Sequence, residues 1–305
     1  MNITLVIMRQ IVIMFCYLAI GYFLYRYQLI TKEGSRSLAN LLLYVSLPCV
    51  IIKSFCISNT AESRTELLLS MLMGLGLLVL SMSVSTLCFR KKPLENFSGA
   101  FSNAGFMGVP LITATLGANA VFYTAGMIAL LNVFQWTYGQ RLLSGTSSGP
   151  RRYRQLFLNP LTVSLVVGLL VFSLEITAPD TVMVCLSALA GLNAPLAMIV
   201  LGIYLAQTHL LQLFCQGSHY LVAVVRLLLI PLLSIALLSL LPGELLLIKQ
   251  ALLMATCAPV GSNVAVFAQK LDKDYTHAVQ LVCLSTILSI VTMPLILGLA
   301  TALWT

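Results

Sequence analysis

Long apolar stretches alternate with short polar connections along the whole chain. A helix needs about 20 predominantly apolar residues to cross the hydrocarbon core of a bilayer. The first stretch lacks a basic leader and a clear small-residue cleavage site, so we expect a retained helix rather than a signal peptide. The pattern predicts an all-α polytopic membrane protein with ten transmembrane helices, at residues 3–25, 37–56, 66–89, 97–116, 119–143, 157–175, 182–207, 219–241, 245–269 and 276–303.

The fourth and ninth predicted helices contain residues that disfavour a helix near their middle. They carry "NAGFMGVPL" at 103–111 and "CAPVGSNVAVFAQ" at 257–269. Proline lacks a backbone N–H and clashes with the preceding turn, and glycine costs about 1 kcal/mol relative to alanine. We therefore expect the backbone to unwind at 107–110 and at 258–263, with its free polar groups facing protein or a wet cavity. A simple kink is the alternative for each proline taken alone.

A polar connection near the middle divides the chain into two halves. Residues 144–156 are rich in Ser, Gly, Pro and Arg, which is typical of a flexible cytoplasmic linker. Residues 1–143 and 157–305 would each supply five helices, and an odd number inverts the second unit relative to the first. The second helix of each half also carries a proline, Pro48 and Pro195. The chain thus predicts two inverted five-helix repeats, an arrangement that recurs in secondary transporters.

Composition and charge agree with a membrane protein and indicate its orientation. The 305 residues are 59% hydrophobic and 9% charged, against roughly 25% charged in soluble domains. The connections are too short to hold an enzyme active site outside the membrane. Twelve Lys and Arg residues follow the odd-numbered helices, and three lie in the other connections. Because basic loops stay in the cytoplasm, this bias predicts that both termini are outside, and the net charge of +8 does not indicate nucleic-acid binding.

The two predicted breaks are candidates for a binding site. The N-terminal end of a half-helix carries free N–H groups and about +0.5 charge, so it can hold an anion without a buried lysine. Asn103 and Asn263 flank the breaks and offer amide donors and acceptors, with a helix–helix hydrogen bond as the alternative for each. All nine acidic residues lie outside the predicted helix centres, which favours an anionic or neutral substrate over a cation. The candidate substrate-binding residues are Asn103, Gly105, Met107, Gly108, Val109, Pro110, Pro259, Val260, Gly261, Ser262 and Asn263.

The other polar residues inside the predicted helices have simpler interpretations. We expect Arg9 and Arg226 to snorkel to the interface, with the attraction of an anion as the alternative for Arg226. Eight cysteines in mostly apolar runs, with no CxxC pair or Cys/His cluster, indicate buried small hydrophobes and no metal site. Two stripes of polar residues are expected to join helices by packing, namely Asn132 with Gln135 and Ser285 with Ser289 and Thr292.

Four motifs, in this order, resemble the bacterial branch of the auxin efflux carrier family: "FSNAGFMGVPL", "APLAMIVLGIYLA", "APVGSNVAVFAQK" and "LSTILSIVTMPLIL". The resemblance covers almost the whole chain. It implies ten helices in inverted repeats, similar to bile-acid sodium symporters and sodium/proton antiporters, with crossed, broken helices four and nine. Helices one, two, six and seven would form a scaffold, and helices three to five and eight to ten a transport domain. Asn103 to Pro110 match the first crossover and Pro259 the second, while the plant pattern places its second proline slightly later.

The resemblance also implies a function. Relatives move organic anions, namely auxin in plants and malate, malonate or related carboxylates in bacteria, and they suggest a homodimer in the plasma membrane. We therefore expect a secondary transporter of small organic anions with an elevator-type mechanism and no cofactor. Coupling to sodium or protons is open, and a sodium-coupled symporter of the bile-acid type is the alternative. An intramembrane enzyme is disfavoured, because the three histidines lie in loops or near helix ends and no HExxH or GxSxG motif occurs.

Overall fold

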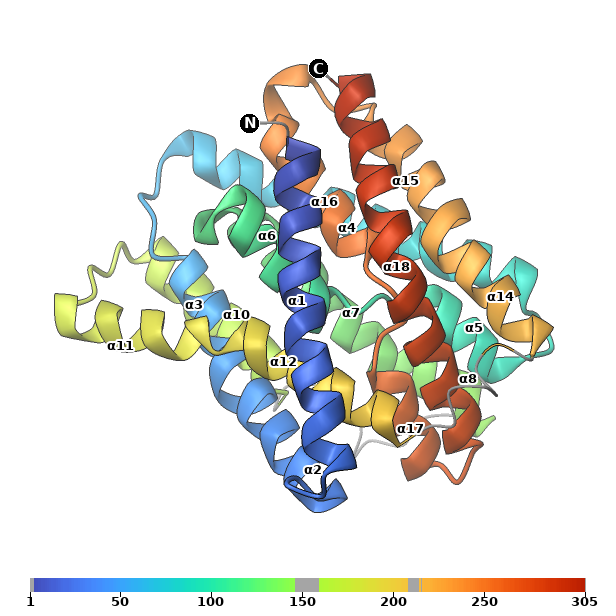
Figure 1. Cartoon of the computed structure of the whole chain (residues 1–305). Helices are drawn as coiled ribbons and strands as arrows, with labels where there is room; N and C mark the ends of the chain where they lie inside the picture. The colour runs from blue at the N-terminus through green and yellow to red at the C-terminus, as the bar shows by residue number, and fades with distance from the viewer. Residues whose placement is uncertain (1–2, 146–158, 208–213, 215, 305) are drawn as a thin grey trace.

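The computed structural model describes residues 3–145, 159–207, 214 and 216–304, and it is all-helical (Figure 1). The first half contains α1 (Ile3–Arg26), α2 (Lys32–Leu41), η1 (Leu42–Ser46), α3 (Leu47–Ser54), α4 (Ala61–Cys88), α5 (Pro93–Ala100), η2 (Ala104–Gly108), α6 (Val109–Leu116), η3 (Ala118–Val121), α7 (Phe122–Phe134), η4 (Gln135–Gly139) and α8 (Gln140–Ser144). The second half contains α10 (Pro160–Ser173), α11 (Asp180–Gly191), α12 (Asn193–Ala206), α14 (Gly217–Val224), η5 (Val225–Leu229), α15 (Ile230–Leu238), η6 (Gly243–Leu245), α16 (Leu246–Cys257), α17 (Asn263–Lys270) and α18 (Tyr275–Trp304).

Seven helical segments of the described chain are long and apolar enough to cross a membrane. They coincide with the first, second, third, fifth, seventh, eighth and tenth predicted stretches. The prediction of an all-α polytopic membrane protein is thereby confirmed. The other three stretches correspond to the 14-residue helix α10 and to two helices that are interrupted, α5 to α6 and α16 to α17.

Three prolines are each accommodated by a preceding π-turn. Pro48, Pro110 and Pro231 are the second residues of α3, α6 and α15, which follow η1, η2 and η5. A π-turn widens the backbone to i→i+5 bonds, so the turn before the proline is loosened without ending the helix. The predicted unwinding at 107–110 is therefore wrong, because residues 104–116 form one continuous helical run. The first interruption lies further upstream, at 101–103, whereas the second covers 258–262, within the predicted 258–263.

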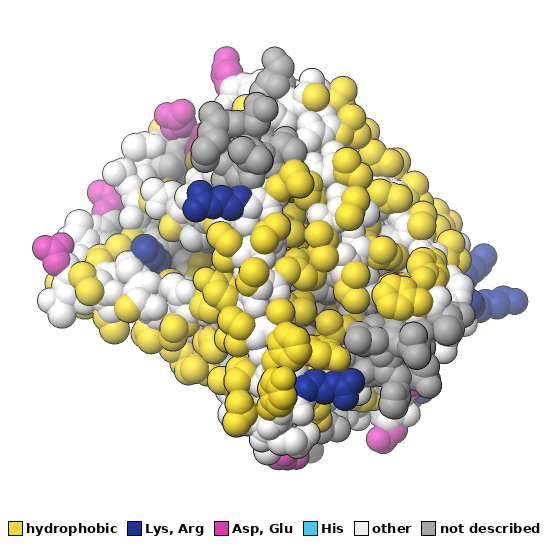
Figure 2. Space-filling model, viewed as in Figure 1, with side chains coloured by type: hydrophobic (Ala, Val, Ile, Leu, Met, Phe, Trp, Pro, Cys, Tyr) yellow, Lys and Arg dark blue, Asp and Glu magenta, His cyan; other side chains and the backbone are white. Residues whose placement is uncertain are grey.

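The most extensive helix contacts fall within two sets of helices, and α1 also contacts α6 and α18 across them. In one set α1 packs along α12, and α3 packs against α10 and α11. In the other, α4 contacts α5, α7 and α15, while α18 contacts α14, α16 and α17. The face formed by α1 and α18 is covered by hydrophobic side chains with few charged ones (Figure 2), as expected for a surface in contact with lipid.

The cysteines are less buried than predicted. Cys257 and Cys283 are buried, but Cys16, Cys88 and Cys185 are exposed. An apolar run in a membrane protein can face lipid as well as the core, which explains the difference. No disulfide joins the seven cysteines that the structure describes.

Candidate functional site

The two interruptions meet and pair with each other inside the helical bundle. The Asn103 N–H donates to the Pro259 carbonyl at 2.8 Å, and the Gly261 N–H donates to the Phe101 carbonyl at 2.9 Å. Ser102 and Val260 thus form an isolated antiparallel bridge. Backbone groups that lose their helical partners at the breaks are satisfied across the contact, as a bilayer interior requires. We call residues 101–103 and 258–262 the crossover.

Glycines allow the close approach of the crossing segments. A Cβ at Gly261 would lie 3.0 Å from the Ser102 carbonyl oxygen. A Cβ at Gly108 would lie 3.2 Å from the Cα of Ala255 in α16. Both contacts involve backbone, which cannot rotate away. The "GFMG" and "VGS" patterns of the sequence therefore serve packing at the crossing.

Arg226 binds the carbonyl ends of both half-helices that lead into the crossover. It is 1% exposed, and its Nη1 donates to the Gly99 carbonyl at 3.0 Å and to the Ala100 carbonyl at 3.4 Å. Its Nη2 donates to the Thr256 carbonyl. These carbonyls end α5 and α16, where each helix dipole is negative. The expectation that Arg226 snorkels is wrong, because its guanidinium forms hydrogen bonds with the C-terminal carbonyls of two helices.

No charged side chain lies at the N-terminal ends of the two helices that lead away from the crossover, among the residues that line the cavity there. The helical run from η2 to α6 begins at Ala104, and α17 begins at Asn263. These starts border a small cavity of about 30 Å³ whose lining contains no charged residue. The cavity is lined by Leu43, Leu47, Ser102, Asn103, Gly105, Phe106, Ile128, Leu131, Asn132, Gln135, Leu161, Gly261, Ser262 and Asn263.

The two asparagines beside this cavity differ in their partners. The Nδ2 of Asn263 donates to the Oε1 of Gln135 at 2.7 Å. The Nδ2 of Asn103 is buried and has no hydrogen-bond partner. A buried donor without a partner costs about 1–3 kcal/mol, so it is an expected contact point for a bound acceptor. About 30 Å³ is room for one or two waters, so the cavity is closed to larger molecules in this conformation.

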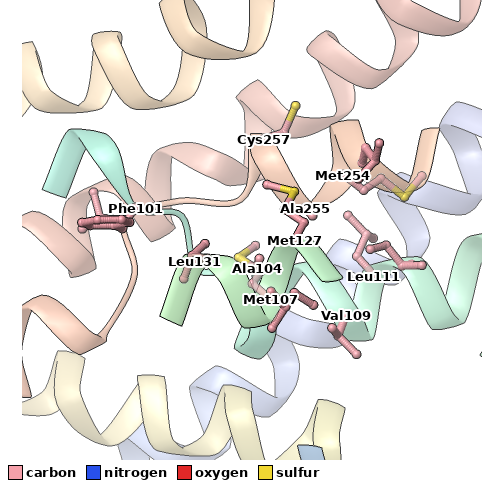
Figure 3. Close-up of a cluster of buried hydrophobic side chains, with 14 of the residues drawn as sticks. Phe101, Ala104, Met107, Val109, Leu111, Met127, Leu131, Met254, Ala255 and Cys257 are labelled. Carbon is pink, nitrogen blue, oxygen red and sulfur yellow. The ribbon is translucent and has the colours of Figure 1, made fainter. Parts of the chain in front are cut away.

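The structure brings five of the eleven candidate residues to the cavity wall, namely Asn103, Gly105, Gly261, Ser262 and Asn263. Met107 and Val109 lie instead in a buried apolar cluster with Ala255 and Met254 of α16 (Figure 3). Gly108 also abuts α16.

The remaining three candidates act through their backbone or line another space. Pro259 contributes its carbonyl to the crossover. The N–H of Val260 donates to the Ser285 Oγ at 3.1 Å. Pro110 lines a separate cavity described below.

Sequence reasoning missed three residues that support the crossover. Arg226 holds the carbonyl ends, Gln135 holds Asn263, and Ser285 accepts the N–H of Val260. Spacing along one helix predicts only helix packing for Gln135 and Ser285, because it does not show which residues of another helix face them. An arginine within an otherwise apolar span was the signal available for Arg226, since intramembrane charges are usually paired.

Comparison with known proteins decides the family. A family model described as "Membrane transport protein" matches residues 6–297. The chain belongs to this family. It is the auxin efflux carrier family that the four motifs indicated. Its members are transporters, so the chain is a multi-pass membrane transporter of a small molecule and not an enzyme.

A curated relative agrees with this assignment. The chain is 23% identical over 243 residues to a protein of Rhizobium meliloti (strain 1021) named "Putative malonate transporter". The match covers 77% of this chain and 73% of that protein. In the part of the chain that the structure describes, no group of three His, Cys, Asp or Glu residues is placed to hold a metal ion.

Proposed function

We propose that this chain is a secondary transporter of small organic anions that binds a substrate carboxylate at the crossover. The observation that carries the proposal is that the negative helix ends at the crossover have a charged partner, whereas the positive helix ends have none. Arg226 satisfies the carbonyl ends of α5 and α16, while the starts of η2 and α17 border a cavity without any charged side chain. Two helix N-termini supply about +0.5 charge each, so together they match one carboxylate.

The side chains at the cavity favour the same ligand. The unpaired Nδ2 of Asn103 is a donor for a carboxylate oxygen. Asn263 also lines the cavity, and the hydrogen bond from its Nδ2 to Gln135 fixes its orientation. A cation would meet two positive helix ends and no carboxylate, which argues against a cation as the main substrate. Malonate, malate and auxin-like carboxylates are the substrate class, and the name of the relative from Rhizobium meliloti makes malonate the first to test.

The architecture suited to this function is a ten-helix fold of two inverted repeats, residues 1–143 and 157–305. The interrupted helices would be the fourth member of each repeat. The set formed by α1, α3, α10, α11 and α12 would be the scaffold. The set formed by α4 to α8 and α14 to α18 would be the transport domain, with α2 joined to the scaffold. Since the cavity is closed, the substrate would gain access when the transport domain slides against the scaffold.

Charge and chain direction support a plasma-membrane protein with both termini outside. The twelve-to-three bias of Lys and Arg favours this orientation. The start of α1 and the end of α18 lie at the same end of the molecule (Figure 1), as an even number of spans requires. A homodimer formed by the scaffolds is part of the proposal on the basis of the family alone.

Flux in proteoliposomes tests the proposal. Purified protein should accumulate labelled malonate, and Asn103→Ala should lower the flux about tenfold or more, because a hydrogen bond to a charged group is worth about 1.5–3 kcal/mol. Asn119→Ala is a matched control, since Asn119 is exposed and lies outside the crossover cavity. Normal flux in Asn103→Ala would contradict the assignment. Flux that vanishes without sodium would favour the sodium-coupled alternative.

A further inference from the structure

A second, larger cavity lies beside α6. Its volume is about 210 Å³, and it shares no lining residue with the crossover cavity. Helices α1, α3, α6, α11 and α12 form its wall and bring together Gln10, Lys53, Thr113, Ser187 and Asn193. A single water needs only about 10–15 Å³, so this space admits a small organic molecule.

Lys53 is the charged residue of this wall. The lining contains no Asp or Glu. Within the described chain, the one ion pair found joins other residues, His277 and Glu95. Lys53 is half-buried at the end of α3, where water screens its charge less than at an open surface. An ammonium without a carboxylate partner, beside a cavity, favours an anion.

Asn193 supplies a second and independent indication. It is 3% exposed, and neither its Nδ2 nor its Oδ1 has a hydrogen-bond partner. Buried amide groups are almost always bonded, so an orphaned pair at a cavity wall calls for a ligand or water. The Nδ2 donor suits a carboxylate oxygen held by Lys53.

The other end of the molecule repeats this arrangement. A cavity of about 260 Å³ lies beside α17 and is lined by Arg36, Tyr204 and Gln207. The Nε2 of Gln207 is buried without a partner. Each cavity therefore combines one cation with one unpaired amide donor. Each also lies beside the half-helix that leads away from the crossover, α6 in one case and α17 in the other.

We propose that the cavity of Lys53 and Asn193 is a second binding site for a small carboxylate, separate from the crossover, with the cavity of Arg36 and Gln207 as its counterpart at the opposite end. The proposal rests on the proposed function for its ligand class. Such sites raise the local concentration of an anion before it reaches a closed central site. They give the transporter a place to hold substrate on either side while the crossover stays shut.

Cysteine modification tests the site at Thr113, which is exposed and lines the cavity. The background replaces every cysteine by serine except the buried Cys257 and Cys283. In Thr113→Cys protein, the ratio of the anionic to the cationic methanethiosulfonate rate should exceed the same ratio for a free thiol in solution by about 3–10-fold, as expected for one nearby positive charge. Lys53→Met and Lys53→Gln should remove this preference, while Lys53→Arg keeps it.

Protection by malonate tests binding itself. Malonate should slow the modification of Thr113→Cys, and it should still do so when Asn103→Ala is added. Lys53→Met should abolish the protection. Protection that is lost with Asn103→Ala but kept with Lys53→Met would assign the effect to the crossover and overturn the proposal. Protection by anionic lipid in place of malonate would overturn it too. Absence of malonate flux with intact protection would instead refute the crossover proposal alone.

Discussion

Arg226 shows how one residue can fix the polarity of a whole site. Its guanidinium reaches three carbonyls that belong to two different helices. A buried charge is tolerated only when paired or hydrogen-bonded, and here its partners are helix ends rather than a carboxylate. Because both negative ends are satisfied on this side, the positive ends remain available on the other.

Replacing Arg226 should therefore destabilise the fold. Arg226→Met leaves buried carbonyls without donors, and we expect a loss of about 3–5 kcal/mol, the range for breaking a buried charged network. Arg226→Lys should recover part of this loss, since an ammonium cannot span both helix ends as a planar guanidinium does. Thermal unfolding in detergent measures the effect. Equal melting temperatures for all three proteins would contradict this role.

Gly261 gives a second prediction at the scale of one residue. Gly261→Ala places a methyl group about 3.0 Å from the Ser102 carbonyl oxygen, and overpacking of this kind costs about 1–3 kcal/mol. The control is Gly76→Ala in α4, where the nearest atom to the new Cβ is the Leu237 Cδ2 at 3.7 Å. Melting temperatures should fall for Gly261→Ala and stay close to wild type for Gly76→Ala. The reverse order would contradict the tight crossing.

At the scale of the helix, the two breaks differ in how far the sequence predicts them. The second break coincides with Pro259 and Gly261, so its position was predictable from local chemistry. The first lies at "FSN", which contains neither glycine nor proline. Its extended backbone is stabilised by pairing with residues 259–261, a contact that spacing along the chain does not show. Pro110 led to a prediction of a break at 107–110, but a π-turn before the proline accommodates it within a continuous helix.

Because η2 is a π-turn, Pro110 helps to set the helix register at the crossover. With alanine at this position, the turn can relax to an α-helix, which shifts Asn103, the residue before the helix start, by one residue in helix register. We expect Pro110→Ala to lower malonate flux several-fold, with a smaller change in melting temperature. Pro294→Ala is the control, because Pro294 lies inside the continuous helix α18 and does not line the crossover cavity. A large loss of stability with normal flux would show that Pro110 is only structural.

At the scale of the whole molecule, a titratable cluster joins the ends of three helices of the proposed transport domain. The His219 Nε2 and His277 Nδ1 lie 3.1 Å apart, and the His277 Nε2 lies 3.5 Å from Glu95 Oε1. These residues belong to α14, α18 and α5. The hydrogen bond from His277 lowers the pKa of the Glu95 carboxyl, with Lys92 adding a smaller effect in the same direction.

This cluster predicts a pH dependence of stability. A carboxyl whose pKa is lowered on folding stabilises the protein above its ordinary pKa of 4.5, and the contribution is lost as pH falls through the folded value. Glu95→Gln should therefore melt below wild type at neutral pH, and the difference should shrink as the pH falls below this ordinary value. Melting curves from neutral to acid pH measure this. A difference that grows toward acid pH would contradict the assigned direction.

The central claim is that a substrate carboxylate binds at the positive helix ends beside Asn103. Solid-state NMR can measure this contact directly. The experiment records rotational-echo dephasing between malonate labelled with ¹³C at its carboxylates and the side-chain ¹⁵N of asparagine, in protein reconstituted into membranes. The account predicts dephasing that corresponds to a carboxylate within hydrogen-bond distance of an amide. In an Asn193→Ala background, which removes the asparagine of the second cavity, this signal should fall in Asn103→Ala and be retained in Asn119→Ala. Undiminished dephasing in Asn103→Ala, or none in the wild type with malonate bound, would contradict it.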